Sequence, residues 1–363
     1  MIKEHVVFLL VLVSLSLSLS GCLDQDDDDN NSPYIGSITI DDASARPVGL
    51  TRDTTNNLIS TALGSKNVGE VWSVPYGSAQ MSKKNLTGVA LSGFSFGGSM
   101  FYDPNNYLYV CSNPTVAGIP PSVVVLKRED TGSYNWTDAI NFPSNKQTQG
   151  HCYSVIRAGD SVLATNSVAG ANPAVSFAVA YADANNLHAQ TSMIPQVLYG
   201  RDLNYTQAEL TGSNLVTDIK AAKSQPSGKI SYYIVDSKRS RIYNIVTTLA
   251  TRKVTASQAI GSDTIATTPT AMVQYSDKIF LVAQLSSTSN SVGSIYKIKF
   301  DSNKRNPVST LISSTRSPVS ALVIGSDYFG KTTNPVVFSL NRELGGLDVF
   351  SVDEFTFGEN NPA

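Results

Sequence analysis

The feature that most constrains this chain is a repeat of about fifty residues, built from short β-forming runs. Each unit has an apolar run, a polar turn, a second apolar run, a looser loop and a third run of alternating apolar residues. The centres of the third runs follow one another at steps of 52, 53, 66, 53 and 53 residues: Trp72, Val124, Phe177, Tyr243, Tyr296 and Val349. A fixed period of this length, made of short strands, is typical of a β-propeller rather than a β-sandwich.

The repeat predicts an all-β domain over residues 35–363. A single four-stranded blade has two apolar faces, so blades become stable when they stack around an axis and cover each other's faces. Six units use nearly the whole region, and we expect six blades, with seven as the alternative. The long step falls on residues 185–212, which are interpreted as an insertion between the third and fourth units. One short helix is expected, at residues 215–223.

The two ends of the repeat region predict how the ring closes. The last unit needs a fourth strand, and an unpaired edge would leave the ring open there. The run SITIDD at residues 37–42 is a suitable outer strand beside VFSVDEFTF at residues 349–357. We therefore expect the N-terminal strand to complete the last blade.

Two stretches resemble a known class of repeat. DPNNYLYVCSNPTVAGIPPSVVVLKRED, at residues 103–130, is similar to the repeats of NHL-type and related six-bladed propellers, in which a turn of Asp and Asn precedes Leu-Tyr-Val. TTNNLISTALGSKNVGEVWSVP, at residues 54–75, is a weaker copy. The resemblance implies the propeller fold and says little about activity.

The first residues have the layout of a secretory signal, in which Lys3 precedes a short apolar run that fades into alternating Leu and Ser. LSGC, at residues 19–22, looks like the bacterial lipobox, where the signal peptide is cut before the cysteine and the cysteine is acylated. We therefore expect a signal peptide at residues 1–21 and lipidation of Cys22. Several acyl chains on one residue hold a protein on a membrane almost irreversibly.

The residues after the lipobox predict a disordered acidic tether at residues 22–34. LDQDDDDNNSP is polar, strongly acidic and unable to bury apolar surface. Leu23 stands where an aspartate would retain a lipoprotein in the inner membrane, so the resemblance favours the outer membrane. The acidic run is either a solvating spacer or, by resemblance, a signal for export to the cell surface.

The charge balance bears on the expected partners. The chain has 27 Lys and Arg against 29 Asp and Glu, and the part beyond the signal and the tether has 26 basic and 23 acidic residues. This near balance gives no basic footprint for nucleic acid. The expected partners are the membrane, through the lipid anchor, and an envelope protein or glycan, and the expected state is a monomer.

Two cysteines, Cys111 and Cys152, remain beyond the lipobox. In an oxidising envelope compartment such a pair forms a disulfide or stays as two buried thiols, and the sequence leaves both open. A disulfide would join the second strand of the second unit to the first strand of the third unit.

The stretch GFSFG around Ser95 matches the G-x-S-x-G pattern of hydrolase nucleophiles. That pattern needs a helix after the serine, whereas here a strand and a turn follow, so Ser95 is given no catalytic role. Gly93 and Gly97 are interpreted as breakers before an inner strand.

His151 lies near the expected mouth of the central channel, where it is either solvated or in contact with a ligand. No metal-ligand spacing and no phosphate-binding loop occur, so neither a metal nor a cofactor is expected.

These features predict function only coarsely, because propellers host both enzymes and binding proteins. The first hypothesis is a lipid-anchored envelope protein whose propeller is a binding scaffold for a protein, a peptide or a glycan, with no catalytic residues. The alternative is a propeller hydrolase or lyase that uses His151 as a base at the channel mouth. A cluster of His151 with two or more acids at one channel mouth would favour the enzyme, and a bare channel with an aromatic or apolar outer patch would favour the scaffold.

Overall fold

A computed structural model describes most of the chain after residue 32. The described residues are 33–64, 68–88, 94–115, 119–142, 150–158, 161–168, 175–183, 194–199, 216–237, 240–251, 254–260, 267–286, 292–300, 307–327, 334–341 and 343–352. The predicted signal peptide, Cys22 and nearly all of the predicted tether lie outside these residues. Within the described ranges, no helix is long and apolar enough to span a membrane.

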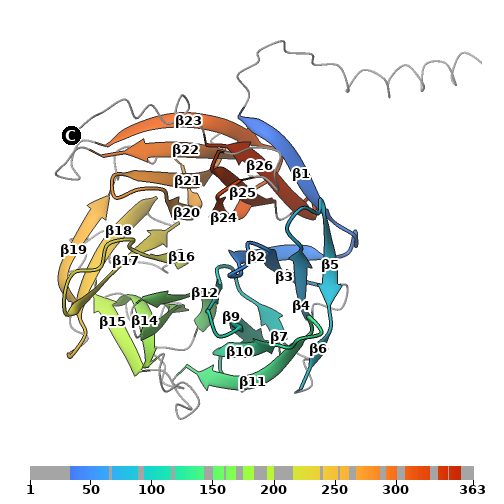
Figure 1. Cartoon of the computed structure of the whole chain (residues 1–363). Coiled ribbons are helices and arrows are strands. Elements are labelled where there is room, and N and C mark those ends of the chain that lie inside the picture. The colour runs from blue at the N-terminus through green and yellow to red at the C-terminus, as the bar shows by residue number, and fades with distance from the viewer. Residues whose placement is uncertain are drawn as a thin grey trace, which may run out of the picture. The chain divides into compact units, whose positions relative to one another are not determined.

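The elements of the described residues are all strands, and they form six blades around a centre (Figure 1). Blade 1 contains β2 (Arg46–Arg52), β3 (Leu58–Leu63), β4 (Gly69–Val74) and β5 (Gln80–Lys84). Blade 2 contains β7 (Phe94–Phe96), β8 (Phe101–Tyr102), β9 (Tyr107–Pro114), β10 (Ser122–Arg128) and β11 (Tyr134–Asn141), with β6 (Leu86–Thr87) on its outer edge. Blade 3 contains β12 (Gly150–Ala158), β13 (Ser161–Val168), β14 (Val175–Asp183) and β15 (Ile194–Tyr199).

The other three blades repeat the same order from the inside outward. Blade 4 contains β16 (Val216–Ala221), β17 (Lys229–Asp236), β18 (Arg241–Thr248) and β19 (Val254–Ile260). Blade 5 contains β20 (Pro269–Gln274), β21 (Ile279–Leu285), β22 (Gly293–Lys299) and β23 (Val308–Thr315). Blade 6 contains β24 (Val319–Gly325), β25 (Val336–Asn341), β26 (Gly346–Ser351) and β1 (Tyr34–Ile40). The predicted six-bladed, all-β propeller is confirmed.

The inner strands close the ring. β2 contacts β8, β9 contacts β12, and β12, β16, β20 and β24 follow in turn until β24 contacts β2. The predicted closing strand is also confirmed, since β1 pairs antiparallel with β26 and completes blade 6. Its paired residues extend from 34 to 39, opposite 346–350, so both partners begin a few residues earlier than expected. The end of β1 also pairs in parallel with β5, which joins blades 6 and 1 into one sheet.

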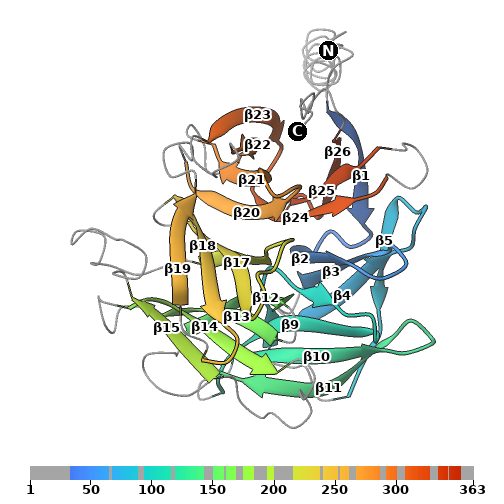
Figure 2. The same cartoon turned by 60° about the vertical axis from the view of Figure 1, so that its left-hand side comes forward.

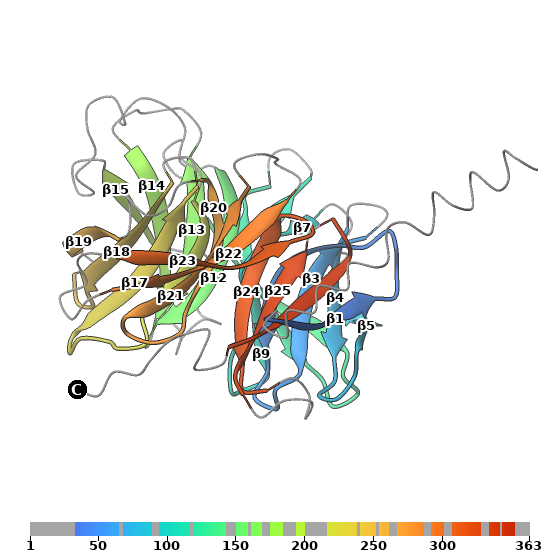
Figure 3. The same ribbon diagram turned by 90° about the horizontal axis from the view of Figure 1, so that it is seen from above.

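The burial of the strands follows their place in the blade. The second strands, such as β3 and β25, carry continuous apolar runs and are buried along nearly their whole length. They are buried because each face of a blade packs against a neighbouring blade. The outer strand β23 is far more exposed, with Val308 at 64% and Leu311 at 52% of their full accessible surface. The turned views show the sheets of neighbouring blades side by side, and the ring from its edge (Figures 2 and 3).

The apolar core is divided into clusters that lie between blades. One cluster joins blade 1 to blades 2 and 3, and the other four lie between blades 6 and 1, 3 and 4, 4 and 5, and 5 and 6. Between blades 4 and 5, for example, the rings of Tyr233 and Phe280 meet edge to face with centroids 4.8 Å apart. The blades therefore stabilise one another, as the repeat predicted.

One sequence prediction was wrong. Residues 215–223 were expected to contain a helix, but they contain β16, the inner strand of blade 4. The pairing with a neighbouring strand decides the structure there, and the local sequence pattern does not reveal that pairing. Within residues 185–212, which were interpreted as an insertion, the described residues 194–199 form β15, which pairs with β14 as the outer strand of blade 3. These residues belong to the blade, and the rest of the predicted insertion lies outside the described residues.

Candidate functional site

Every inner strand is interrupted near the axis, at an equivalent place in each blade. In five blades the inner strand shifts its register by a β-bulge, and in blade 2 it is split into β7 and β8. The interruptions fall at Val48, Gly97–Met100, Tyr153–Ser154, Thr217, Thr270 and Ser320. A bulge bends a strand and redirects its side chains, and bulges occur often beside binding sites.

Glycines allow the backbone of blade 2 to reach the axis. A Cβ on Gly49 would lie 1.9 Å from the carbonyl oxygen of Gly98, and a Cβ on Gly97 would lie 2.5 Å from the carbonyl oxygen of Cys152. The neighbours nearest to Gly98 are carbonyl oxygens of blades 3, 4 and 1. Gly97 is therefore required by a close approach of two backbones, which gives a physical reason for the breaker predicted there.

A buried carboxylate, Asp218 of β16, connects several blades beside this crossing point. Its Oδ1 accepts hydrogen bonds from the backbone N of Ile219 at 2.9 Å and from the hydroxyls of Ser99 and Ser154, the latter at 3.2 Å. Its Oδ2 accepts a bond from the backbone N of Met272 in blade 5 at 3.0 Å. The Nζ of Lys220 lies 3.3 Å from Oδ1, so the buried charge is both hydrogen-bonded and paired, as burial requires.

At the end of the axis where the inner strands begin lies a cavity of about 590 Å³, which we call the His151 mouth. It is lined by the first residues of the inner strands and by the ends of second strands, so all six blades contribute to it. Its apolar lining residues are Val48, Leu63, Phe96, Leu285, Pro318 and Val319. Its groups with titratable or amide side chains are His151, Tyr153, Asn113 and Glu343. Among the described residues, this mouth has one carboxylate.

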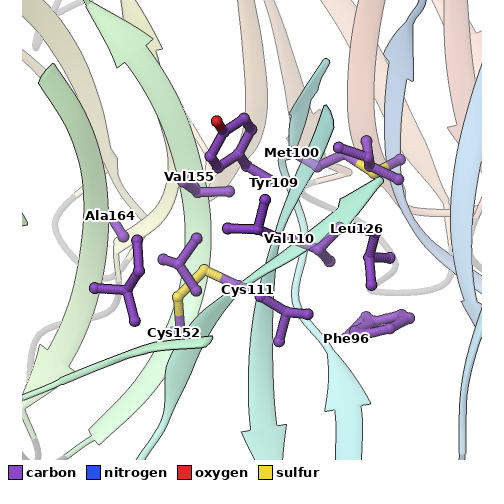
Figure 4. Packing of buried hydrophobic residues seen from close by; sticks show 14 of the residues in the cluster. Phe96, Met100, Tyr109, Val110, Cys111, Leu126, Cys152, Val155 and Ala164 are labelled. Atoms are coloured by element: carbon purple, nitrogen blue, oxygen red, sulfur yellow. A yellow bond between two sulfur atoms is a disulfide. The ribbon is translucent and has the colours of Figure 1, made fainter. Parts of the chain in front are cut away.

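A disulfide joins Cys111 of β9 to Cys152 of β12 below this mouth, with the two Cα atoms 5.2 Å apart (Figure 4). The same two strands are held by the amide of Asn113, whose Nδ2 donates to the carbonyl oxygen of Cys152 and whose Oδ1 accepts from the N of Cys152, both at 2.8 Å. Both cysteines are fully buried among apolar side chains of blades 2 and 3. Of the two alternatives that the sequence left open, the structure has the disulfide, and it joins the second strand of blade 2 to the first strand of blade 3.

The structure places His151 near the start of β12, exposed at the mouth, with its ring edge to face against Tyr153 at a centroid distance of 6.0 Å. Burial raises the pKa of the Tyr153 hydroxyl.

Ser95 lies within the short strand β7, where its hydroxyl donates to the carbonyl oxygen of Asn113 at 3.2 Å. No helix follows it, so the geometry of a nucleophile elbow is absent at this serine. No described group of His, Cys, Asp and Glu side chains forms a metal site.

At the other end of the axis lies a second cavity, of about 750 Å³, which we call the Arg52 mouth. The last residues of the inner strands and the turns after them line it. Its charged lining residues are Arg52, Asp53, Asp103, Arg157, Lys220 and Lys223, and apolar side chains such as Met100, Phe101 and Ile156 lie among them. Sequence reasoning missed this site and Asp218 alike. One signal in the sequence could have indicated them: charged residues occur at the ends of the runs that form inner strands. The clearest case is Asp218 within LVTDIKAA, an acid inside a mostly apolar run.

No family model matches this sequence, and no curated protein matches it. The structure is similar to that of a protein of unknown function from Dyadobacter fermentans, with 8% identity, 88% of this chain and 99% of that chain covered, and a TM-score of 0.58. It is similar to the α-L-arabinofuranosidase Arb93A from Fusarium graminearum at 10% identity, with 89% and 99% covered and a TM-score of 0.57.

Virginiamycin B lyase from Staphylococcus aureus is similar at 9% identity, with 88% of this chain and 99% of that chain covered and a TM-score of 0.50. The arabinofuranosidase and the lyase are propeller proteins. At these identities the likeness concerns the fold alone, because one fold carries many activities. The strand order and the comparisons therefore agree that the chain is a β-propeller.

Proposed function

We propose that this protein is a lipid-anchored protein of the bacterial cell envelope whose propeller binds a protein, a peptide or a glycan at the His151 mouth. The observation that carries the proposal is the lining of that mouth, where apolar side chains from several blades surround a few polar groups. Binding sites for small ligands and peptide side chains are mostly apolar, with a few polar groups that fix orientation.

The framework of the mouth supports this proposal. The disulfide and the two hydrogen bonds of Asn113 fix β12 against β9, and these strands carry His151 and Asn113 themselves. A ligand would therefore meet a preformed surface and lose less entropy of ordering on binding. His151 can donate or accept one hydrogen bond at the rim, and Glu343 can accept one.

The lining of the mouth favours the scaffold over the enzyme alternative. An enzyme that used His151 as a base was expected to bring two or more acids to the same mouth, and the described lining brings Glu343. General acid–base catalysis of the expected kind needs a second positioned group within hydrogen-bond reach.

The proposal can be tested by binding. The full-length protein in detergent would be screened against a displayed library of random peptides and an array of bacterial envelope oligosaccharides. Leu63→Asp and Leu285→Asp, which place a charge in the lining of the mouth, should weaken any selected ligand at least tenfold. Val308→Asp, on the exposed outer strand β23, is the matched control and should leave the affinity unchanged. Ligands that bind all three variants equally would show that the mouth is not the binding site.

The envelope location rests on LSGC and is proposed from the sequence. Cys22→Ala should leave an uncleaved precursor without acyl chains, and globomycin treatment of the wild type should leave an uncleaved precursor. Membrane fractionation and mass spectrometry of the N-terminal peptide measure both effects. Unchanged, acylated protein in the Cys22→Ala membrane fraction would contradict the lipid anchor, whereas a loss from the outer-membrane fraction would support it.

A further inference from the structure

We propose that the Arg52 mouth is a second binding site, which takes an organic anion of about monosaccharide size through a carboxylate or phosphate group. This site lies at the ends of the inner strands, whereas the His151 mouth lies at their beginnings. The proposal is therefore independent of the ligand of the His151 mouth.

The first observation is the balance of charge in the lining. Four cationic side chains line the cavity, Arg52 from blade 1, Arg157 from blade 3, and Lys220 and Lys223 from blade 4 or the turn after its inner strand. They share the cavity with two carboxylates. The side chains of the lining therefore carry a net positive charge, and such an excess attracts ligands of the opposite sign.

The second observation is that the two carboxylates are already engaged by the protein. Asp53 accepts hydrogen bonds from the backbone N of Thr55 at 2.8 Å and of Asn57 at 2.9 Å, and Arg128 donates to its other oxygen at 2.7 Å. Burial alone would raise the pKa of Asp53, but the hydrogen bonds from Asn57 and Thr55 outweigh it and lower that pKa. Asp53 is therefore a fixed, ionised part of its turn, and it is paired with a cation from outside the lining.

Asp103 repeats this arrangement in blade 2. Its Oδ1 accepts from the backbone N of Asn105 at 2.8 Å and of Tyr107 at 3.0 Å, and Tyr109 donates to its Oδ2 at 3.4 Å. Asp103 is 4% exposed. Both acids thus serve their own turns, in the way that aspartate stabilises such turns generally.

The third observation is how Arg52 and Lys220 are held. One terminal nitrogen of Arg52 donates to the carbonyl oxygen of Ile324 in blade 6 at 2.8 Å and the other donates to Asn56, so the guanidinium is fixed between two blades. Partial burial lowers its pKa, although Asp327 and Asp53 oppose this, and a bound anion would favour its charged form further.

Lys220 lies deeper, where its Nζ contacts the hydroxyl of Ser99 at 2.9 Å and Asp218 at 3.3 Å. An ammonium group has three donors, so this arrangement leaves capacity for a ligand oxygen. A guanidinium and an ammonium that are held in place in this way provide the charge-assisted donors that carboxylate and phosphate groups accept.

The fourth observation is the apolar part of the cavity. The ring of Phe101 stacks on Tyr109 at 4.3 Å, with 5° between the planes, and Met100 and Ile156 lie in the same lining. A volume of about 750 Å³ is more than one carboxylate or phosphate group needs and falls in the range of sites for small organic molecules. The ligand therefore has a body that packs on apolar side chains as well as an anionic group.

The test uses three probes with the same ring and different charge: glucuronate, glucose 6-phosphate and glucose. They would be titrated into the full-length protein in detergent by isothermal titration calorimetry. We expect at least one of the two anions to bind saturably and glucose to bind at least tenfold more weakly. Glucuronate and glucose 6-phosphate then distinguish a carboxylate site from a phosphate site.

Variants locate the site. Arg52→Gln should weaken the better anion at least tenfold, because a hydrogen bond to a charged group is lost. Lys223→Gln, at the exposed rim, should weaken it about twofold to fivefold, since this cation makes a more solvated contact. Lys84→Gln on the outer strand β5 is the matched control, and Leu63→Asp in the His151 mouth should also leave this binding unchanged.

Binding of glucose as tight as that of the anions, or no binding of either anion, would overturn the proposal. So would an affinity that neither Arg52→Gln nor Lys223→Gln reduces. If Arg52→Gln fails to fold, the affinity of Lys223→Gln tests the site instead. This variant should fold, because Lys223 is exposed on the turn after β16 and lies outside the packed core. Binding lost on Leu63→Asp but kept on Lys223→Gln would assign the anion to the His151 mouth instead, and would overturn this site without affecting the other.

Discussion

The junction between blades 6 and 1 and the junction between blades 2 and 3 secure the ring by different means. At the first, β1 pairs with β26 along its length and with β5 at its end, and Ile38 is fully buried in the shared core. At the second, a disulfide and the Asn113 amide join β9 to β12 where glycines bring the backbones together. Among the described strands, none is exchanged between blades 2 and 3.

The difference follows from how the chain runs. Blades 6 and 1 contain the two ends of the ring, so only an exchanged strand can supply a continuous ladder there. At the junction of blades 2 and 3, Gly97 leaves no room for a Cβ beside the axis and Gly98 leaves little, so the two backbones approach closely next to the buried apolar cluster. A covalent bond and two amide hydrogen bonds supply the attachment there. Ring closure thus depends on a strand in one place and on a cross-link in the other.

The largest effect is expected at the strand closure. Ile38→Asp would bury a charge within the core of blades 6 and 1 and should lower the free energy of unfolding by more than about 4 kcal/mol. Urea unfolding followed by the fluorescence of Trp72, which is buried in the same cluster, measures it. Thr39→Asp, one residue later on the same strand and exposed, is the control and should change it by less than about 0.5 kcal/mol. Equal effects of the two variants would mean that β1 does not seal the ring.

The next largest effect is expected at Asp218, which connects blades 2 and 3 to blades 4 and 5, and the latter two take part in neither junction. Asp218→Ala would leave Lys220 without its ion-pair partner and the backbone N of Met272 without its acceptor, and should cost about 3–5 kcal/mol. Asp218→Asn keeps one oxygen acceptor and should cost clearly less. Chemical denaturation of both variants gives the comparison. If Asp218→Ala lowers the free energy of unfolding by less than about 1 kcal/mol, the two junctions stabilise the ring without the contacts of Asp218.

The cross-linked junction should respond by a smaller amount. Replacing both Cys111 and Cys152 by Ala opens a loop of 41 residues and should cost about 2–4 kcal/mol, by the loss of constraint on the unfolded chain. The wild type under reducing conditions should lose a similar amount, whereas the double variant should be insensitive to reductant. Unfolding curves with and without dithiothreitol measure this. If the double variant is as stable as the oxidised wild type, the disulfide does not stabilise the junction, and the hydrogen bonds of Asn113 hold it instead.

The smallest effect is expected at Ser95, which binds the carbonyl of the same Asn113. Ser95→Ala removes one partly buried hydrogen bond and should cost about 0.5–1.5 kcal/mol. A fluorophosphonate probe should not label this serine, because the elbow geometry of a nucleophile is absent. Covalent labelling of the wild type that disappears in Ser95→Ala would favour the hydrolase instead.

The period of the sequence was sufficient to predict the blades and their closure. Apolar second runs such as LISTAL and VVFSLN are long enough to be recognised, because their strands are buried on both faces. The third-run residues Trp72, Val124, Tyr243, Tyr296 and Val349 lie in the third strands of their blades, as the repeat requires. These features are local patterns repeated at a fixed distance, which a single sequence displays directly.

The axis could not be predicted in the same way. A bulge adds one residue to a strand, so the alternation of apolar residues changes phase within the run. In the sequence, Leu215, Ile219 and Ala222 stand at a helical spacing, whereas in β16 the register shifts between Val216 and Asp218, so the apolar pattern there misled the prediction. Asp218 and the Arg52 mouth also depend on side chains from different blades, and their proximity is fixed by the ring and not by neighbours in the sequence.

The strand that closes the ring is also the one that receives the chain from residues 1–32. Any mechanical force on that segment, such as the pull of a proposed anchor at Cys22, therefore enters the domain through β1. The ladder with β26 and the parallel contact with β5 divide this load between the last blade and the first. Detachment of β1 would open the ring at the same moment. The proposed attachment to the membrane and the proposed binding surface would therefore be lost in one event.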